Sequence, residues 1–188
     1  MKHLTSYRQL LATFVVAASL VFSQGAVIAA SAQELDQQAD MALEKLYRTT
    51  PVAKKLAAEA NGILIFPSIL KAGLLVGGQH GEGVLRVNGK TTGYYSSSAV
   101  SYGLQAGAQT FGYAMFMMTP EALKYLDSSD GWEVGVGPTI VVVDDGAAKT
   151  LTTTTAKDDI YAFVFGQSGL MAGIGLQGSK INKIDPDK

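Results

Sequence analysis

The sequence predicts an α+β domain: two N-terminal helices, then a coiled or partly closed antiparallel β-sheet with one short helix between its strands. Three observations support this class. A helical period occupies residues 34–48, strand-like segments follow from residue 62 onward, and 21 glycines are spread through the chain. Glycine weakens an ordinary strand and is usually kept for bulges, bends and close backbone approach. So many glycines among strands therefore indicate a strongly curved sheet.

The first 32 residues have the order of an export signal rather than of a folded element. Lys2 and Arg8 precede a long apolar stretch, and Ala30-Ser31-Ala32 has the small-x-small pattern that signal peptidase accepts. We expect cleavage after Ala32 and one domain over residues 33–188, located in the periplasm or secreted and able to attach peripherally to a membrane. A retained transmembrane anchor is the alternative.

Two helices are expected to lead the domain. Over residues 34–48, apolar residues recur at spacings of three and four with charged residues between them, as in an amphipathic helix. Thr50 then stands at an N-cap position and Pro51 at the first position of a second helix, which ends at Asn61-Gly62. Later, Thr119-Pro120-Glu121 supplies a cap, a first-turn proline and an acidic residue for the short third helix.

Strands dominate after Gly62. Ile63–Phe66 is expected to stop at Pro67, and His80 is expected in a turn. Asn88-Gly89 is the strongest local signal, because both central positions of a type I′ turn need positive φ. It predicts a hairpin of strands 83–87 and 90–95. The remaining strand-like stretches are 72–78, 97–117 (more than one strand), 132–143, 159–166 and 169–178.

Residues that carry catalytic chemistry are scarce, so we expect no enzyme, no catalytic residue, no metal and no cofactor. The chain has no cysteine, and its two histidines are His3, inside the predicted signal, and His80. No histidine pair, thiolate or serine–histidine–carboxylate triad can be built from this supply. Asp144-Asp145 and Asp158-Asp159 are interpreted as turn residues rather than paired catalytic carboxylates or a calcium site. A hydrolase is the least favoured alternative.

Two glycine motifs come close to nucleotide-binding signatures. Gly173–Gly178 fits G-x-G-x-x-G, but the polar end of the chain follows it and leaves no helix to receive a pyrophosphate. Gly83 and Gly89 are separated by five residues, whereas a P-loop has four. The formal charge is −1 and becomes more negative when Lys2 and Arg8 leave, which disfavours binding to phosphate backbones. We expect neither nucleotide nor nucleic acid as a partner.

A sparse set of cations lies beside apolar and aromatic residues in the predicted elements. Each of them alone would be a solvated surface charge. If the fold gathers them on one face, they would form a weak site for anionic headgroups, with Tyr94, Tyr95 and residues 116–118 as apolar material. These candidate lipid-binding residues are Lys54, Lys55, Lys71, Arg86 and Lys90.

Several ordered blocks resemble the SYLF domain of Ysc84-like proteins. Gly62–Gly78, which contains Lys71-Ala72-Gly73, is similar to the opening of that domain. Later blocks follow in the expected order, so that the likeness covers residues 35–184: Gly81–Leu85, Tyr94-Tyr95, Gly103–Gln109 and Gly169–Gly178.

The resemblance implies lipid binding, with Lys71 at the position of the family's Lys-Ala-Gly block. Eukaryotic members bind phosphoinositides and acidic lipids, and some act on actin. Gln167-Ser168 stands where many of them have a lysine, and an exported protein would meet neither phosphoinositides nor actin. We therefore expect a phospholipid or a membrane surface as partner. The alternative is a structural or stress-related envelope protein that self-associates or binds a protein partner along a sheet edge.

Overall fold

The structure is a computed structural model that describes residues 30–102, 107–127, 131–143, 148–149, 151–152, 156–169 and 178–188. Residues 1–29 of the predicted signal, Asp144-Asp145 and residues 170–177, which hold most of the Gly173–Gly178 motif and of the expected strand 169–178, lie outside these ranges. Within them, no helix combines the length and the apolar character needed to cross a membrane.

Two helices lead the domain, as predicted. Helix α2 spans Ala32–Thr49 and begins with a capping box, in which the Ser31 side chain accepts from the Glu34 backbone while the Glu34 carboxylate accepts from the Ser31 backbone. Helix α3 spans Pro51–Glu59 with Pro51 in its first turn. Thr50 occupies the N-cap of α3, but its side chain makes no capping hydrogen bond. The short helix α4, Pro120–Asp127, starts where Thr119 Oγ1 accepts from the Ala122 amide at 3.2 Å.

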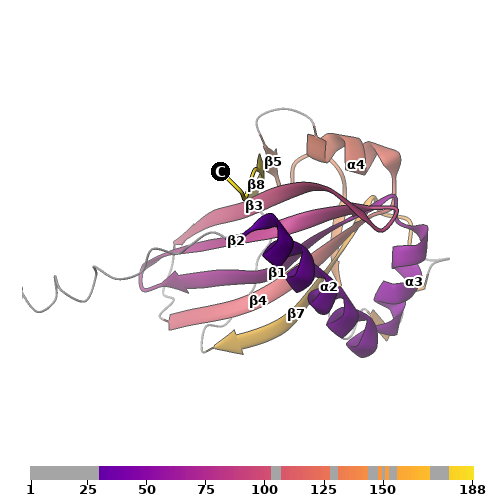
Figure 1. Cartoon of the computed structure of the whole chain (residues 1–188). Coiled ribbons are helices and arrows are strands. Elements are labelled where there is room, and N and C mark those ends of the chain that lie inside the picture. Colours follow the sequence, from indigo (N-terminus) through magenta and orange to yellow (C-terminus); the bar gives the residue numbers. More distant parts are fainter. Residues whose placement is uncertain are drawn as a thin grey trace, which may run out of the picture.

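Eight strands form one strongly curled sheet in the order β5-β8-β3-β2-β1-β4-β7-β6, and α2 crosses one of its faces (Figure 1). The α+β class and the partly closed sheet are confirmed. The sheet is mixed, because β6 runs parallel to β7 while all other neighbours are antiparallel. The strands are β1 Gly62–Gly73, β2 Val76–Val87, β3 Lys90–Tyr102, β4 Gly107–Met117, β5 Trp132–Glu133, β6 Ile140–Val143, β7 Ile160–Gly169 and β8 Lys180–Ile184.

The Asn88-Gly89 hairpin is confirmed. Asn88 and Gly89 have φ values of 51° and 74°, and Val87 pairs with Lys90 across the turn. Residues 97–117 contain the end of β3 and all of β4, so that the expectation of more than one strand is also confirmed.

Other strand boundaries were wrong. Pro67 does not end β1, because the pairing of β1 shifts between Phe66 and Ile69, and such a bulge accommodates a proline. Residues 72–78 form the β1–β2 hairpin end rather than a strand, and His80 lies within β2 instead of a turn. Residues 132–143 are two separate strands. The polar C-terminal segment forms β8, which pairs with both β3 and β5.

Two cores lie on opposite faces of the sheet. One contains Leu64, Phe66, Tyr113, Ile160 and Ile181 together with α4 residues, and because strands from both ends of the sheet contribute, this face is the inside of the curl. The other lies between the outer face of the sheet and helices α2 and α3. Gly83 is needed at the inner core, because a Cβ there would lie 2.4 Å from the Ile65 carbonyl oxygen and 2.7 Å from the Phe66 ring.

Candidate functional site

The structure does not bring the five predicted cations together on one face. Lys54 and Lys55 are exposed on α3, and Lys90 is exposed at the β2–β3 turn. Arg86 pairs with Ile63 near the start of β1, whereas Lys71 lies at the far end of that strand, roughly 26 Å away at about 3.3 Å per residue. A single headgroup site cannot contact both Lys71 and Arg86.

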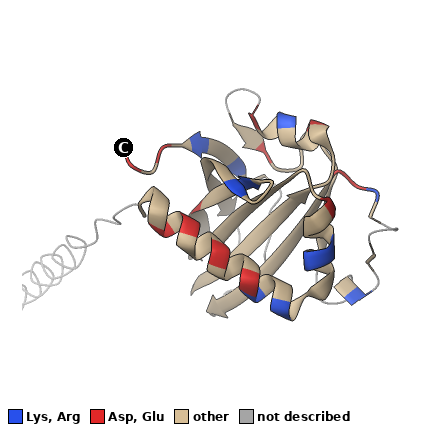
Figure 2. Cartoon of the chain, turned by 45° about the vertical axis from the view of Figure 1, so that its right-hand side comes forward, with Lys and Arg blue, Asp and Glu red and all other residues tan. Residues whose placement is uncertain are grey.

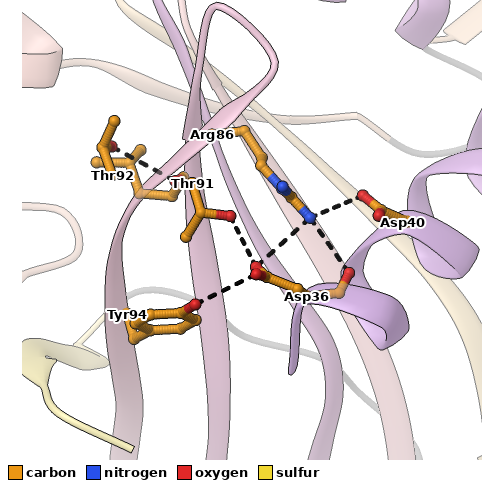
Figure 3. A network of polar contacts seen from close by, with 7 residues as sticks. Asp36, Asp40, Arg86, Thr91, Thr92 and Tyr94 are labelled. Carbon is orange, nitrogen blue, oxygen red and sulfur yellow. Dashed lines mark hydrogen bonds and ion pairs between the residues drawn. The ribbon is translucent and has the colours of Figure 1, made fainter. Parts of the chain in front are cut away.

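Arg86 is held by acidic residues of α2 (Figure 3). Its Nη2 lies 2.8 Å from Asp40 Oδ1 and 3.5 Å from Asp36 Oδ1, and it donates to the Asp36 backbone oxygen at 3.2 Å. Asp36 also accepts from Thr91 Oγ1 at 2.7 Å and from the Tyr94 hydroxyl at 3.3 Å. Partial burial and the nearby Asp36 carboxylate both raise the pKa of Tyr94. This network attaches α2 to β2 and β3, so the charge of Arg86 is already neutralised within the fold.

Helix α2 is rich in acidic residues, which form the red bands on this helix in Figure 2. Asp36 and Asp40 contact Arg86, whereas Glu34 and Glu44 are exposed. A negative surface repels anionic headgroups. The helix-covered face is therefore a poor candidate for the surface that meets an anionic membrane.

Lys71 belongs to a polar row inside the curled sheet. It pairs with Gln79 on β2 and with Gln109 on β4, and directly opposed residues of neighbouring strands share one face. All three side chains are at least nine-tenths buried. Gln79 Nε2 donates to Ser179 Oγ at 2.9 Å, whereas the buried Gln109 Oε1 has no hydrogen-bond partner among the residues that the structure describes. Lys71 therefore belongs to the interior rather than to an exposed basic patch.

The far end of the sheet carries an exposed apolar surface that was not predicted from the sequence. Leu74 and Leu75 at the β1–β2 turn are 69% and 61% exposed, and Val100, opposite Gly78, is 67% exposed. Leu70 and Val76 are more than half exposed as well. We call Leu70, Leu74, Leu75, Val76 and Val100 the apolar tip. Large apolar side chains gathered in this way on a surface mark a site of interaction.

The surroundings of the apolar tip are nearly free of charge. Strands β1, β4 and β7 and their neighbours β2 and β3 all have one end here, toward the left of Figure 1. Residues 72–79, 91–118 and 160–179 contain no Asp, Glu, Lys, Arg or His. The corresponding strand ends are tan at the lower left of Figure 2. These long uncharged stretches are the signal by which the sequence could have revealed the surface.

A groove of about 680 Å³ adjoins the apolar tip on the outer face of the sheet. Its walls come from the first turns of α2, with Leu35 and Gln38, and from β1 and β2, with Leu70, Ala72 and Gly78. We call it the α2–β1 groove. Because Leu70 belongs to both features, the groove continues the apolar tip toward α2.

The acidic pair before β7 is used locally. Asp159 accepts from the backbone and side chain of Thr139, both at 2.9 Å, and from Thr119 Oγ1 at 3.2 Å. The hydrogen bonds from Thr139 lower the pKa of Asp159. Asp158 accepts from the Tyr161 hydroxyl at 3.0 Å. These contacts agree with the interpretation of the pair as turn residues that fix the entry to β7.

Residues 98–186 match a family model described as Ysc84, Las17-binding protein actin regulator. No curated protein matches the chain. The matched segment runs from the second half of β3 to just beyond β8, and it includes α4 and the strands from β4 to β8. The block around Lys71 precedes the match, so the role that the resemblance gives to Lys71 stays a prediction.

Proposed function

The chain belongs to the Ysc84 (SYLF) family, and from that premise we propose that it is a non-enzymatic lipid-binding domain that docks on a phospholipid membrane through its apolar tip. The family description names Las17 binding and actin regulation. Neither is proposed for this chain, because an exported protein would meet neither partner.

The observation that carries the proposal is the exposure of Leu74 and Leu75 at a hairpin end without neighbouring acidic residues. Fully burying a leucine or valine side chain contributes about 1.5–3 kcal/mol. Because the three residues Leu74–Val76 are already partly covered, their insertion would contribute on the order of 3–5 kcal/mol. A gain of this size supports reversible, peripheral attachment rather than permanent insertion.

The expected preference for anionic lipid is small. Arg86 is paired with two carboxylates, Lys71 lies inside the sheet, and α2 exposes Glu34 and Glu44. Charge therefore contributes little at the apolar tip, and the preference that remains should fall with salt, since exposed charges are screened over about 8–10 Å.

Vesicle flotation tests the proposal, with neutral phosphatidylcholine vesicles and vesicles that also contain phosphatidylglycerol. The protein expressed from the full chain should float with both. The double variant Leu74→Ser/Leu75→Ser should bind at least tenfold more weakly, because about 1.4 kcal/mol corresponds to each factor of ten.

Met41→Ser and Val142→Ser are the matched controls, since these side chains are 62% and 50% exposed on α2 and β6, outside the apolar tip. They should float like the parent, and all variants should melt at similar temperatures. Absence of parent binding, or equal binding of the double variant, would reject docking through the tip. The envelope-protein alternative would then lead, although its sheet edges, β5 and β6, offer only two and four residues for strand addition.

We also infer that the protein is exported and that residues 1–32 are removed, because charged, apolar and small residues follow one another in this order at the start of the chain. N-terminal sequencing of the protein recovered from the envelope decides this point: Met1 would indicate a retained anchor. Cleavage after Ala32 would also remove Ser31 and thus the capping box of α2, at a cost of about 1 kcal/mol in helix stability.

A further inference from the structure

The α2–β1 groove has the position and size of a binding site for part of a lipid. It lies between the first turns of α2 and the outer face of β1 and β2, and its volume of about 680 Å³ falls within the range of about 300–1,000 Å³ typical of small-molecule sites. We propose that this groove binds one acyl chain of a lipid. The inference rests on the proposed function and extends it from surface docking to the holding of a single lipid molecule.

Part of the groove offers apolar surface to a chain of methylene groups, and Ser68, Gln79, His80 and Glu82 form its polar part. Leu35, Leu70 and Ala72 provide apolar surface, and Gly78 exposes a stretch of β2 without a side chain above it. A Cβ added at Gly78 would meet only the Ala99 carbonyl oxygen, at 3.8 Å, so that the space over this residue is open. Gln38 supplies an amide that can donate a hydrogen bond to a lipid ester or carboxyl oxygen.

The length and continuity of the groove favour an acyl chain over other occupants. Ser68, Leu70 and Ala72 line it at every second position of β1, which corresponds to roughly 13 Å along the strand. One leaflet of a bilayer has a hydrocarbon thickness of about 15 Å, half of the full core. Because Leu70 also belongs to the apolar tip, an acyl chain could pass from the leaflet into the part of the groove beside Leu70 and Ala72, while His80 and Glu82 line the groove farther along β2.

The test uses a monomeric fluorescent fatty acid, cis-parinaric acid, and no vesicles, so that it is independent of membrane docking. The protein expressed from the full chain should bind it saturably at one site. Gln38→Trp places a large ring in the groove from the helix side and should weaken binding at least tenfold. Gln37→Trp is the matched control, because Gln37 is an exposed neighbour on α2 that does not line the groove. It should bind like the parent.

A second variant approaches the groove from the sheet. Gly78→Phe fills the open space over β2 and should also weaken fatty-acid binding at least tenfold, whereas Leu74→Ser/Leu75→Ser should leave it unchanged. Conversely, Gln38→Trp should still float with vesicles. A parent protein that binds the fatty acid but does not float would therefore refute tip docking alone, and a parent protein that floats but does not bind the fatty acid would refute the groove alone.

Two results would overturn the proposal. The first is a parent protein that shows no saturable binding, and the second is equal affinity in the parent, Gln38→Trp and Gly78→Phe.

Discussion

Replacing Gly89 by valine should destabilise the fold through backbone strain alone. Gly89 has a φ of 74°, which lies in the left-handed region, and a Cβ added there meets no atom within 4 Å. Steric crowding is thus absent, and the cost is that of holding an L-residue in this conformation, about 1–2 kcal/mol in general and up to about 3 kcal/mol for a strained residue. For valine, which is β-branched, we expect the upper part of this range.

Gly78→Val is the control that isolates this effect. A Cβ at Gly78 is also in open space, but its φ lies outside the left-handed region, and valine is favoured in strands. Because valine lowers the conformational entropy of the unfolded chain relative to glycine, Gly78→Val should have the same free energy of unfolding as the parent or a slightly higher one.

Thermal melts followed by circular dichroism provide the measurement. A loss of 1 kcal/mol lowers the midpoint of a domain of this size by about 2–4 °C, so Gly89→Val should melt clearly below both the parent and Gly78→Val. Equal midpoints for the two valine variants would refute the role of positive φ at the β2–β3 turn.

Three further predictions concern the polar contacts of the fold. Arg86→Met should lower the free energy of unfolding by about 1–3 kcal/mol, which is less than for a fully buried ion pair because Asp40 is largely exposed. It should leave vesicle flotation unchanged, because Arg86 is bound to α2. Asp159→Asn should lower the melting midpoint at neutral pH, and the midpoint of the variant should depend less on pH in acid than that of the parent. The Thr139 hydrogen bonds depress the pKa of Asp159 in the folded state below the ordinary 3.8, so their contribution to stability is present above pH 3.8 and is lost as the pH falls through the pKa of the folded state. The same dependence of the midpoint on acid pH in parent and variant would contradict this. Gln109→Leu should preserve or raise the midpoint, because the buried Gln109 Oε1 lacks a partner within the described part of the chain. Gln79→Leu should cost about 1–3 kcal/mol by leaving buried Ser179 Oγ without its donor. Equal melts of the two leucine variants would refute the difference assigned to these side chains.

Several parts of the fold could be predicted because they depend on neighbouring residues alone. The apolar period of α2, the proline and cap at the starts of α3 and α4, and the Asn88-Gly89 turn each express the conformational preferences of a few adjacent residues. The scarcity of histidine and the absence of cysteine are properties of composition. None of these features depends on how the strands pair.

The remaining features were decided by tertiary pairing. Pro67 continues within β1 because a bulge forms against β2 and β4, and the polar Lys180–Ile184 segment becomes a strand because β3 lies beside it. The face on which a strand residue lies follows from register, since successive side chains point to opposite sides of the sheet. Register turns Lys71 into the interior and places Arg86 against α2.

The candidate site divides in the same way. The absence of charge from residues 72–79, 91–118 and 160–179 can be read directly from the sequence, as can the resemblance of the Lys71-Ala72-Gly73 block to a known family. Strand pairing, in contrast, brings the ends of β1, β4 and β7 to the same side of the sheet, where Leu74 and Leu75 are exposed. An apolar residue is buried or exposed according to what packs over it, and that depends on segments far apart in the chain.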